Sequence, residues 1–505
     1  MPYPQSGASS SRSLFAQILQ GTGLYSIAMF TQRIGGFIML PIVTRGLSPA
    51  EYGISGVLEQ IGVVLSLLLG SGFAWSLGYF YFKADSDQAR RNVVGSILAG
   101  SAILGFLVAL VCWPLAGPIS RLVFKSDVAT GYLRLTLAGM PVGFALEALF
   151  GWARVANRPG AYLWGSLLRL GMTMAGVIVF LTILRLHIWG MMFSTLAAMS
   201  AAAFALTAYC LRTFRPRFDA SLLPGIAKFA LPLGISALGS FVVNFGDQLI
   251  LPGYVSRADV GTYVLAYKIG MLIYAFVYSP FHVYWSAQVY DIMKRDDAGI
   301  VFARLFTYLA GSLSFCAIGL LAFTVPLMRI LPADYRTAFP IIPVIVVAYC
   351  FRAAGEFVRL LFMAEGRPAY DAATNWIGSA VCLVGYFGLI PKWGIWGAAI
   401  ATVFSFALIA SISFFWTYRL RPYRMELMRL TKVGVAAAAG VALLMFLPAS
   451  SLPGEVVRAV TSLAAFPALL MSQRFFTPGE VEVARNALLR LRSRLPSNPP
   501  AGLSS

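Results

Sequence analysis

Residues Ser48–Gly62 read SPAEYGISGVLEQIG, and residues Ser256–Gly270, 208 positions later, read SRADVGTYVLAYKIG. Five of the fifteen positions are identical without a gap. Each copy opens with a serine and carries an acidic residue three positions on, Glu51 or Asp259, which is the pattern of a helix N-terminus. The two stretches therefore predict the same structural element, built twice.

The offset of about 208 recurs elsewhere in the chain. Glu147 precedes Arg158-Pro159 by eleven residues, and Glu356 precedes Arg367-Pro368 by the same distance. Ile188-Trp189-Gly190 is matched by Ile395-Trp396-Gly397. Three matches at one spacing predict an internal duplication. A repeat of six membrane spans returns the chain to the same side, so the halves should be parallel and related by an axis along the membrane normal, as in two-lobed transporters.

The composition is that of a membrane protein. Of 505 residues, 59% are hydrophobic and 12% charged, and the mean hydropathy is +0.76, against roughly 45–50% apolar and 25% charged in soluble domains. A water-soluble globule is excluded. At about 20 residues per crossing, we expect an all-α polytopic protein of about fourteen spans, or twelve if the short stretches near 433–448 and 455–473 do not cross.

The predicted spans and the duplication divide the chain into five parts. We expect a disordered cytoplasmic tail at 1–13, an N-terminal six-helix lobe at 14–217, a C-terminal six-helix lobe at 218–420, an extra helix pair at 421–474 and a cytoplasmic amphipathic tail at 475–505.

The net charge of +19 fits a membrane orientation better than a nucleic-acid partner. With the N-terminus inside, most Lys and Arg fall in cytoplasmic loops and tails, as the positive-inside rule requires. Both termini are then cytoplasmic, the first span is an uncleaved anchor, and the basic loops meet anionic lipids.

The sequence predicts neither a metal nor a cofactor. Its five cysteines lie in apolar stretches without redox or metal spacing. An embedded polymerase or glycosyltransferase would want outer-face carboxylates on a sizeable loop, and the short outer loops carry only scattered Glu51, Asp127, Asp259 and Asp334. We therefore do not expect an enzyme.

Three motifs together resemble a known family. Leu47-Ser48-Pro49-Ala50-Glu51-Tyr52-Gly53 follows the first span, Gly261 to Ile269 opens the eighth, and Gly394-Ile395-Trp396-Gly397-Ala398-Ala399 precedes the twelfth. Over about residues 14–420 the chain resembles the Wzx-type polysaccharide repeat-unit flippases of the multidrug/oligosaccharidyl-lipid/polysaccharide exporter superfamily.

The resemblance implies a function as well as a fold. It implies alternating access of two lobes that move a polyprenyl-diphosphate-linked oligosaccharide from the inner to the outer leaflet of the bacterial plasma membrane. Such a substrate would feed cell-surface polysaccharide synthesis, such as O-antigen, lipopolysaccharide or exopolysaccharide, with polysaccharide polymerase machinery as a partner. The alternatives left open are a lipid II-type flippase and a cation or drug antiporter of the same superfamily.

Charged residues within the expected spans are the candidates for the site, because such groups are costly in a bilayer unless they line water or are paired. The excess is basic, which favours an anionic head group over a cationic drug. The candidates for substrate binding are Arg33, Arg134, Arg169, Lys268, Arg352 and Arg359. The candidates for ion coupling or charge balance are Glu59, Glu147, Asn244, Asp247 and Glu356.

Three of these positions carry specific expectations. Arg33 lies mid-span and is the first choice for a diphosphate or an acidic sugar, since guanidinium geometry suits phosphate; the alternative is a structural ion pair with Glu59 or Asp247. Asp247 is expected to bind a coupling H⁺ or Na⁺, or else to neutralise Lys268. Residues 352, 356 and 359 share one helical stripe, on which we expect Glu356 to hold both arginines, with Glu147 as its repeat counterpart near Arg154 or Arg169.

Overall fold

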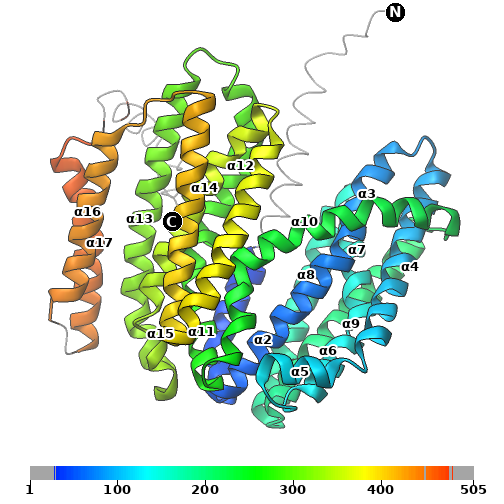
Figure 1. The fold of residues 1–505 in the computed structure, drawn as a ribbon. Coiled ribbons are helices and arrows are strands. Elements are labelled where there is room, and N and C mark those ends of the chain that lie inside the picture. Colours follow the sequence, from blue (N-terminus) through cyan, green and yellow to red (C-terminus); the bar gives the residue numbers. More distant parts are fainter. Residues whose placement is uncertain (1–27, 29, 449–450, 477–479, 481–505) are drawn as a thin grey trace, which may run out of the picture. The chain divides into compact units, whose positions relative to one another are not determined.

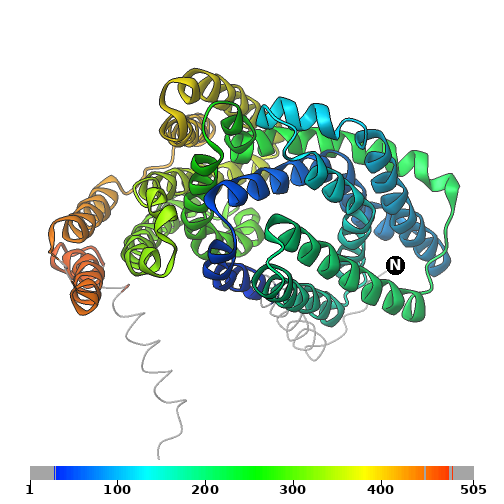
Figure 2. The same cartoon turned by 90° about the horizontal axis from the view of Figure 1, so that it is seen from below.

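A computed structural model describes residues 28, 30–448, 451–476 and 480. Within that part of the chain all regular structure is helical (Figures 1 and 2), which confirms the predicted all-α fold. The expected tail at 1–13 and most of that at 475–505 lie outside the described residues.

The helices follow one another through short connections. The first described helix covers residues 30–46. It is followed by α2 (Pro49–Leu65), η1 (Ser66–Gly70), α3 (Ser71–Lys83), α4 (Asp87–Cys112), α5 (Ala116–Phe124), α6 (Thr130–Ala138), α7 (Met140–Val155), α8 (Pro159–Gly176), η2 (Val177–Ile183), α9 (His187–Thr213), η3 (Ala220–Leu222), α10 (Leu223–Ile250) and η4 (Leu251–Gly253). The remainder comprises α11 (Arg257–Gly270), η5 (Tyr274–Tyr278), α12 (Ser279–Ile292), α13 (Ala298–Ile330), η6 (Ala333–Ala338), α14 (Ile342–Ala364), α15 (Pro368–Leu420), α16 (Leu427–Phe446) and α17 (Leu452–Ser472).

Both duplicated stretches begin helices in the same way. Ser48 Oγ accepts the backbone N–H of Glu51, and the Glu51 carboxylate accepts the N–H of Ser48 at 2.9 Å, with Pro49 in the first turn of α2. At the start of α11, Ser256 Oγ accepts the N–H of Asp259 at 3.1 Å. The predicted helix starts are confirmed.

Ten helices among the described residues are long and apolar enough to cross a membrane, or eleven if the bent pair α6 and α7 forms one span. α15 holds two of the expected spans, because Gly394 interrupts it with φ 54° and ψ −128°. α14 carries Arg352, Glu356 and Arg359. The protein is a multi-pass membrane protein, and fourteen spans stays a prediction.

The described residues form two compact units, one of those up to 275 with 328–416 and one of 276–327 with those from 417 onward. These boundaries cut within the second predicted lobe, so the assignment of lobes at 14–217 and 218–420 stays a prediction. In the first unit, a buried core of α4, α7 and α9 surrounds Trp152. Most of the candidate contacts described below lie within this unit.

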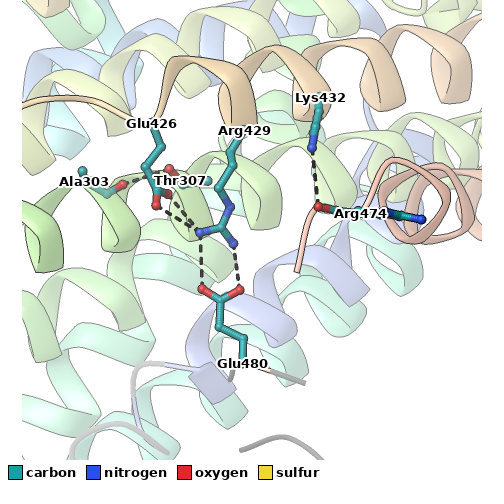
Figure 3. A network of polar contacts seen from close by, with 7 residues as sticks. All are labelled: Ala303, Thr307, Glu426, Arg429, Lys432, Arg474 and Glu480. Carbon is teal, nitrogen blue, oxygen red and sulfur yellow. Dashed lines mark hydrogen bonds and ion pairs between the residues drawn. The ribbon is translucent and has the colours of Figure 1, made fainter. Parts of the chain in front are cut away.

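The second unit contains the predicted extra helix pair. α16 and α17 lie side by side (Figure 1), and their apolar core includes Ile318 of α13. At the start of α16, Arg429 pairs with Glu426 at 3.1 Å and with Glu480 at 3.0 Å (Figure 3). This network ties the chain beyond α17 to the beginning of α16.

Candidate functional site

Arg33 of the first described helix reaches the first turn of η5, the helical segment that follows α11. Its Nη1 donates a hydrogen bond to the carbonyl oxygen of Ala275, and its side chain is only partly exposed. A guanidinium has five N–H donors in a fixed plane. The backbone contact orients this planar group, whose chemistry suits anions.

Arg352 and Glu356 form a bonded pair on α14 beside the same turn. Arg352 Nε donates to Glu356 Oε1 at 2.9 Å, and Tyr274 Oη donates to Glu356 Oε2 at 2.6 Å. The Arg352 guanidinium lies 4.4 Å from the centroid of the Tyr274 ring. Residues 274 and 275, adjacent in sequence, thus bring Arg33 and Arg352 to one turn.

Arg359 has a different carboxylate from the one we expected. Its Nη2 lies 2.6 Å from Oδ1 of Asp371, in the first turn of α15. The prediction that Glu356 binds both arginines is therefore wrong: Glu356 bonds Arg352 and Tyr274, and Asp371 takes Arg359.

Glu147, the repeat counterpart of Glu356, is exposed on α7. Over the described ranges no ion pair with Arg154 or Arg169 occurs, whereas the Arg154 guanidinium lies 5.7 Å from the Tyr162 ring centroid. The two repeat-related acids therefore have unequal surroundings.

Lys268 of α11 and Glu59 of α2 join the two duplicated stretches. Lys268 Nζ lies 2.8 Å from Glu59 Oε2, and both side chains are partly exposed, at 35% and 49%. Lys268 also lies 5.6 Å from the Tyr52 ring centroid. Glu59, not Asp247, therefore neutralises Lys268, and that alternative role of Asp247 is excluded.

Asp247 is fully buried on α10 and is bonded to neutral partners. It accepts hydrogen bonds from the hydroxyl of Tyr263, from the hydroxyl of Thr402 at 3.4 Å and from the backbone N–H of Gln248 at 2.8 Å. These donors come from α11 and α15 as well as from α10. Three helices thus converge on one buried carboxyl.

Two amide oxygens on the same helix lack hydrogen-bond donors in the described structure, Asn244 Oδ1 and Gln248 Oε1. Asn244 donates through Nδ2 to the carbonyl of Ser240 at 2.6 Å, and its own backbone carbonyl accepts from Tyr267. A buried oxygen without a donor costs free energy. α10 thus carries two amide oxygens without donors within three residues of Asp247, and oxygen acceptors are the groups that hard cations bind.

Arg134 and Arg169 have no described contact with this group of residues. Arg134 is exposed on α6, 5.9 Å from the Trp113 ring centroid. Arg169 lies on α8, where its carbonyl accepts the Thr173 hydroxyl at 2.8 Å. Arg33 and Arg352 share one turn, Lys268 pairs with Glu59, and Arg359 pairs with Asp371.

Sequence reasoning missed four partners: Tyr274, Tyr263, Thr402 and Asp371. The three hydroxyls carry no charge, so a search for ionisable groups passes over them. Asp371 stood four residues after Arg367-Pro368 in a helix start, where an acid is explained by the helix dipole alone. The excess of cations over anions on α14 was the one indication that a further acid, here Asp371, pairs with this helix.

The fold and these buried charges define a polytopic transporter-like membrane protein, and comparison with known proteins specifies the family. Residues 18–284 match the model of the family described as Polysaccharide biosynthesis protein, so the chain belongs to that family. The resemblance to polysaccharide flippases of the multidrug/oligosaccharidyl-lipid/polysaccharide exporter superfamily is confirmed.

Two relatives are named for transport. The succinoglycan biosynthesis transport protein ExoT of Rhizobium meliloti (strain 1021) is 21% identical over 66% of this chain, and the match spans 64% of that relative. The lipid III flippase of Escherichia coli (strain K12) is 25% identical over 55% of this chain and 69% of its own length.

Solved structures agree on the fold. The lipid II flippase MurJ, in an inward closed conformation, aligns with a TM-score of 0.75 at 12% identity, covering 90% of this chain and all of that one. An inward-facing multidrug resistance MATE family transporter gives a TM-score of 0.58 at 16% identity, covering 82% and 95%.

Proposed function

We propose that this protein moves an anionic, polyprenyl-diphosphate-linked oligosaccharide from the inner to the outer leaflet of the bacterial plasma membrane. The convergence of Arg33 and Arg352 on residues 274 and 275 carries the proposal. The kinship with a succinoglycan transport protein and a lipid III flippase supports the same substrate class.

The charge balance at this turn suits an anion. Glu356 pairs with Arg352, and Arg33 brings a second guanidinium to the same turn. A guanidinium can form two parallel hydrogen bonds to phosphate oxygens, which gives both affinity and orientation. Arg33 would bind the diphosphate, and Arg352 would orient the adjoining sugar or phosphate oxygens.

The membrane potential can drive export of such a head group. For a head group of charge about −2, an inside-negative potential favours outward movement by roughly 4–5 kcal/mol per 100 mV, from about 2.3 kcal/mol per charge. The protein then has to lower the barrier for the hydrated head group while the lipid tail stays in the bilayer. Alternating access of two lobes would do this.

Asp247 is our candidate for the residue that binds a coupling ion, H⁺ or Na⁺. The support is its complete burial and its described bonds, which come from two hydroxyls and a backbone N–H and include no basic side chain. An acid in that setting can be neutralised by a proton or by a small hard cation. The test measures transfer by the wild type and by Asp247→Asn, once with a pH gradient and once with a Na⁺ gradient. A gradient that speeds transfer in the wild type but not in Asp247→Asn identifies the coupling ion, and export driven by the membrane potential alone responds to neither gradient.

Purified protein in vesicles tests the main proposal, with leaflet transfer of a lipid-linked oligosaccharide as the readout. We expect Arg33→Ala to reduce transfer about 10- to 100-fold, the equivalent of 1.5–3 kcal/mol for charged hydrogen bonds, at unchanged expression. Arg121→Ala is the matched control, because Arg121 is an exposed arginine paired with Asp127 at 3.6 Å. Transfer that survives Arg33→Ala would remove Arg33 from the site.

The competing substrates are tested in the same vesicles. A lipid II-type flippase would transfer a peptide-bearing lipid-linked sugar in preference, and a drug antiporter would move cations. The lipid-linked sugar that accumulates on depletion of the protein in cells identifies the glycan.

A further inference from the structure

A row of tyrosines lies between the Asp247 carboxyl and the pair of Arg352 with Glu356. The row begins at Tyr263, whose hydroxyl donates to Asp247. Tyr267 follows one helical turn later on α11, and the centroids of the two rings are 5.8 Å apart. Both tyrosines are at most 1% exposed. The carboxyl is therefore in contact, through one hydroxyl, with a pair of buried rings.

Tyr349 continues the row from α11 to α14. Its ring meets that of Tyr267 edge-on at a centroid distance of 5.6 Å, and the ring of Tyr274 lies 6.0 Å away. Tyr349 is fully buried. The Arg352 guanidinium lies 5.5 Å from its ring centroid. Tyr349 is thus the residue at which the row reaches the arginine.

Tyr274 ends the row and contacts both members of the ion pair. Its ring lies 4.4 Å from the Arg352 guanidinium, and its hydroxyl donates to Glu356 at 2.6 Å. We call these four residues the tyrosine ladder: Tyr263, Tyr267, Tyr349 and Tyr274. The ladder is hydrogen-bonded to a carboxyl group at each end, and neighbouring rings are in contact between the ends. It forms a continuous chain of side chains from Asp247 to Glu356.

The step from α11 to α14 is made by rings. The hydroxyl of Tyr267 donates its proton to the carbonyl oxygen of Asn244. Tyr349 Oη is buried and has no hydrogen-bond partner among the described residues. Close-packed side chains have low compressibility and transmit strain. A displacement of one ring in the ladder therefore has to be accommodated by the next.

We infer that the tyrosine ladder couples the two sites, so that neutralisation of Asp247 by a bound ion changes how tightly the Arg352 site holds an anionic head group. The inference rests on the proposed function. A neutral carboxyl accepts a weaker hydrogen bond from Tyr263 than a carboxylate does. The Tyr263 ring is then free to shift, and the ladder passes the shift to Tyr274, which touches Arg352 and Glu356. The four tyrosines are positioning residues, and the coupling of the two binding free energies is reciprocal.

Binding measurements test the coupling without a transport assay. The probe is a polyprenyl diphosphate, titrated into the purified protein in nanodiscs, and Asp247→Asn represents the neutral carboxyl. We expect the Kd of the wild type and of Asp247→Asn to differ at least about fivefold, the lower end of common couplings. In a Tyr349→Leu background, Asp247→Asn should leave the Kd unchanged, because leucine has no ring to contact its neighbours. A merely structural role of Tyr349 would weaken binding in both proteins and keep their ratio.

Matched variants control for the loss of a buried tyrosine. Tyr349→Phe keeps the ring and should keep the ratio of the two Kd values. Tyr335→Leu removes an equally buried tyrosine, whose described ring contact is with Tyr52, and should keep the ratio as well. Tyr267→Leu breaks the ladder one contact earlier and should abolish the ratio. It replaces Tyr349→Leu in the test if that variant does not fold.

Three outcomes of the binding test would overturn the inference. Equal Kd values in the wild type and Asp247→Asn would show that the sites are not coupled. A ratio that survives Tyr349→Leu or Tyr267→Leu would show that the coupling does not pass through the ladder. Loss of the ratio in Tyr349→Phe would show that the link is the hydroxyl and not the contact between rings.

Melting temperatures separate failure of the ladder from failure of the proposed function. If the wild type binds no polyprenyl diphosphate, the proposed function fails, and Asp247→Asn, Glu356→Gln and the double variant test the ladder alone. We expect the shift of the double variant to differ from the sum of the single shifts by about 1 °C or more. In the Tyr349→Leu background the shifts should add. Additive shifts with Tyr349 in place would overturn the ladder.

Discussion

The guanidinium of Arg352 lies 4.4 Å from the Tyr274 ring, while the Tyr274 hydroxyl donates to Glu356, the partner of the same arginine. One tyrosine therefore contacts both members of an ion pair on a neighbouring helix. The ring contributes a cation–π contact and the hydroxyl a charged hydrogen bond. These two contributions can be removed separately.

Tyr274→Phe removes only the hydroxyl. We expect the ring to keep its place over Arg352. The free energy of unfolding should fall by about 1–3 kcal/mol, because the Glu356 carboxylate loses a donor. Transfer of the lipid-linked oligosaccharide should fall as well. Tyr274→Ala should reduce transfer further. Thermal unfolding and vesicle transfer measure the two effects, with Tyr254→Phe, an exposed tyrosine, as the control. Unchanged transfer in Tyr274→Phe would argue against a role for Glu356 in orienting Arg352.

Exchanging the charges of Lys268 and Glu59 separates an ion pair from a substrate site. Either Lys268→Glu or Glu59→Lys alone places like charges about 3 Å apart, and we expect each to reduce transfer strongly. The double exchange restores an opposite pair. Recovery in the double variant identifies a pair whose role is contact between helices, while continued loss identifies Lys268 as a cation that the substrate requires.

The local part of this structure could be predicted because its signals are close in sequence. Ser48 with Glu51 specifies a helix start through residues three apart, and Arg352 with Glu356 meets across one helical turn. Both follow from helix geometry alone. The break at Gly394 lies at the start of the motif that precedes the predicted twelfth span.

The partners of Arg359 and Lys268 could not be predicted, because they lie on other helices. Arg359 meets Asp371 on the next helix, and Lys268 meets Glu59 at a separation of 209 residues. Which of several acids a cation reaches depends on how helices pack, and one sequence does not encode that choice locally. The duplication nevertheless placed α2 and α11 in equivalent positions, which was the clue that they could meet.

Arg359 and Asp371 provide a test of which cations are structural. Arg359→Ala and Asp371→Ala each break a pair whose side chains are 14% and 31% exposed. If the pair only fastens α14 to α15, the two variants should lower the melting temperature alike and reduce transfer alike. A larger loss of transfer in Arg359→Ala at equal melting temperature would indicate that Arg359 contacts the substrate.

Arg429 should be the most sensitive charged position of the second unit. It is 12% exposed and bonds two carboxylates, Glu426 and Glu480, while its guanidinium lies 4.4 Å from the Phe475 ring centroid. Arg429→Ala leaves both acids without this cation, and we expect destabilisation of about 3–5 kcal/mol, as for other broken buried pairs. Arg424→Ala is the control on the preceding loop. Limited proteolysis after residue 472, faster in Arg429→Ala only, measures the release of the chain beyond α17.

Gly394 should resist substitution because of its backbone conformation. Its φ of 54° and ψ of −128° form a conformation that residues with a Cβ rarely adopt, and the nearest neighbour of an added Cβ is a methyl carbon of Val255 at 3.0 Å. We expect Gly394→Ala to cost about 1–3 kcal/mol of stability and to alter the angle between the two halves of α15, one of which supplies Thr402 to Asp247. Gly388→Ala, in the same helix with no atom within 4 Å of its Cβ, should be neutral or stabilising by up to about 1 kcal/mol. Thermal unfolding of the two variants compares a strained glycine with a helical one, and equal melting temperatures would rule out a structural requirement for glycine at the break.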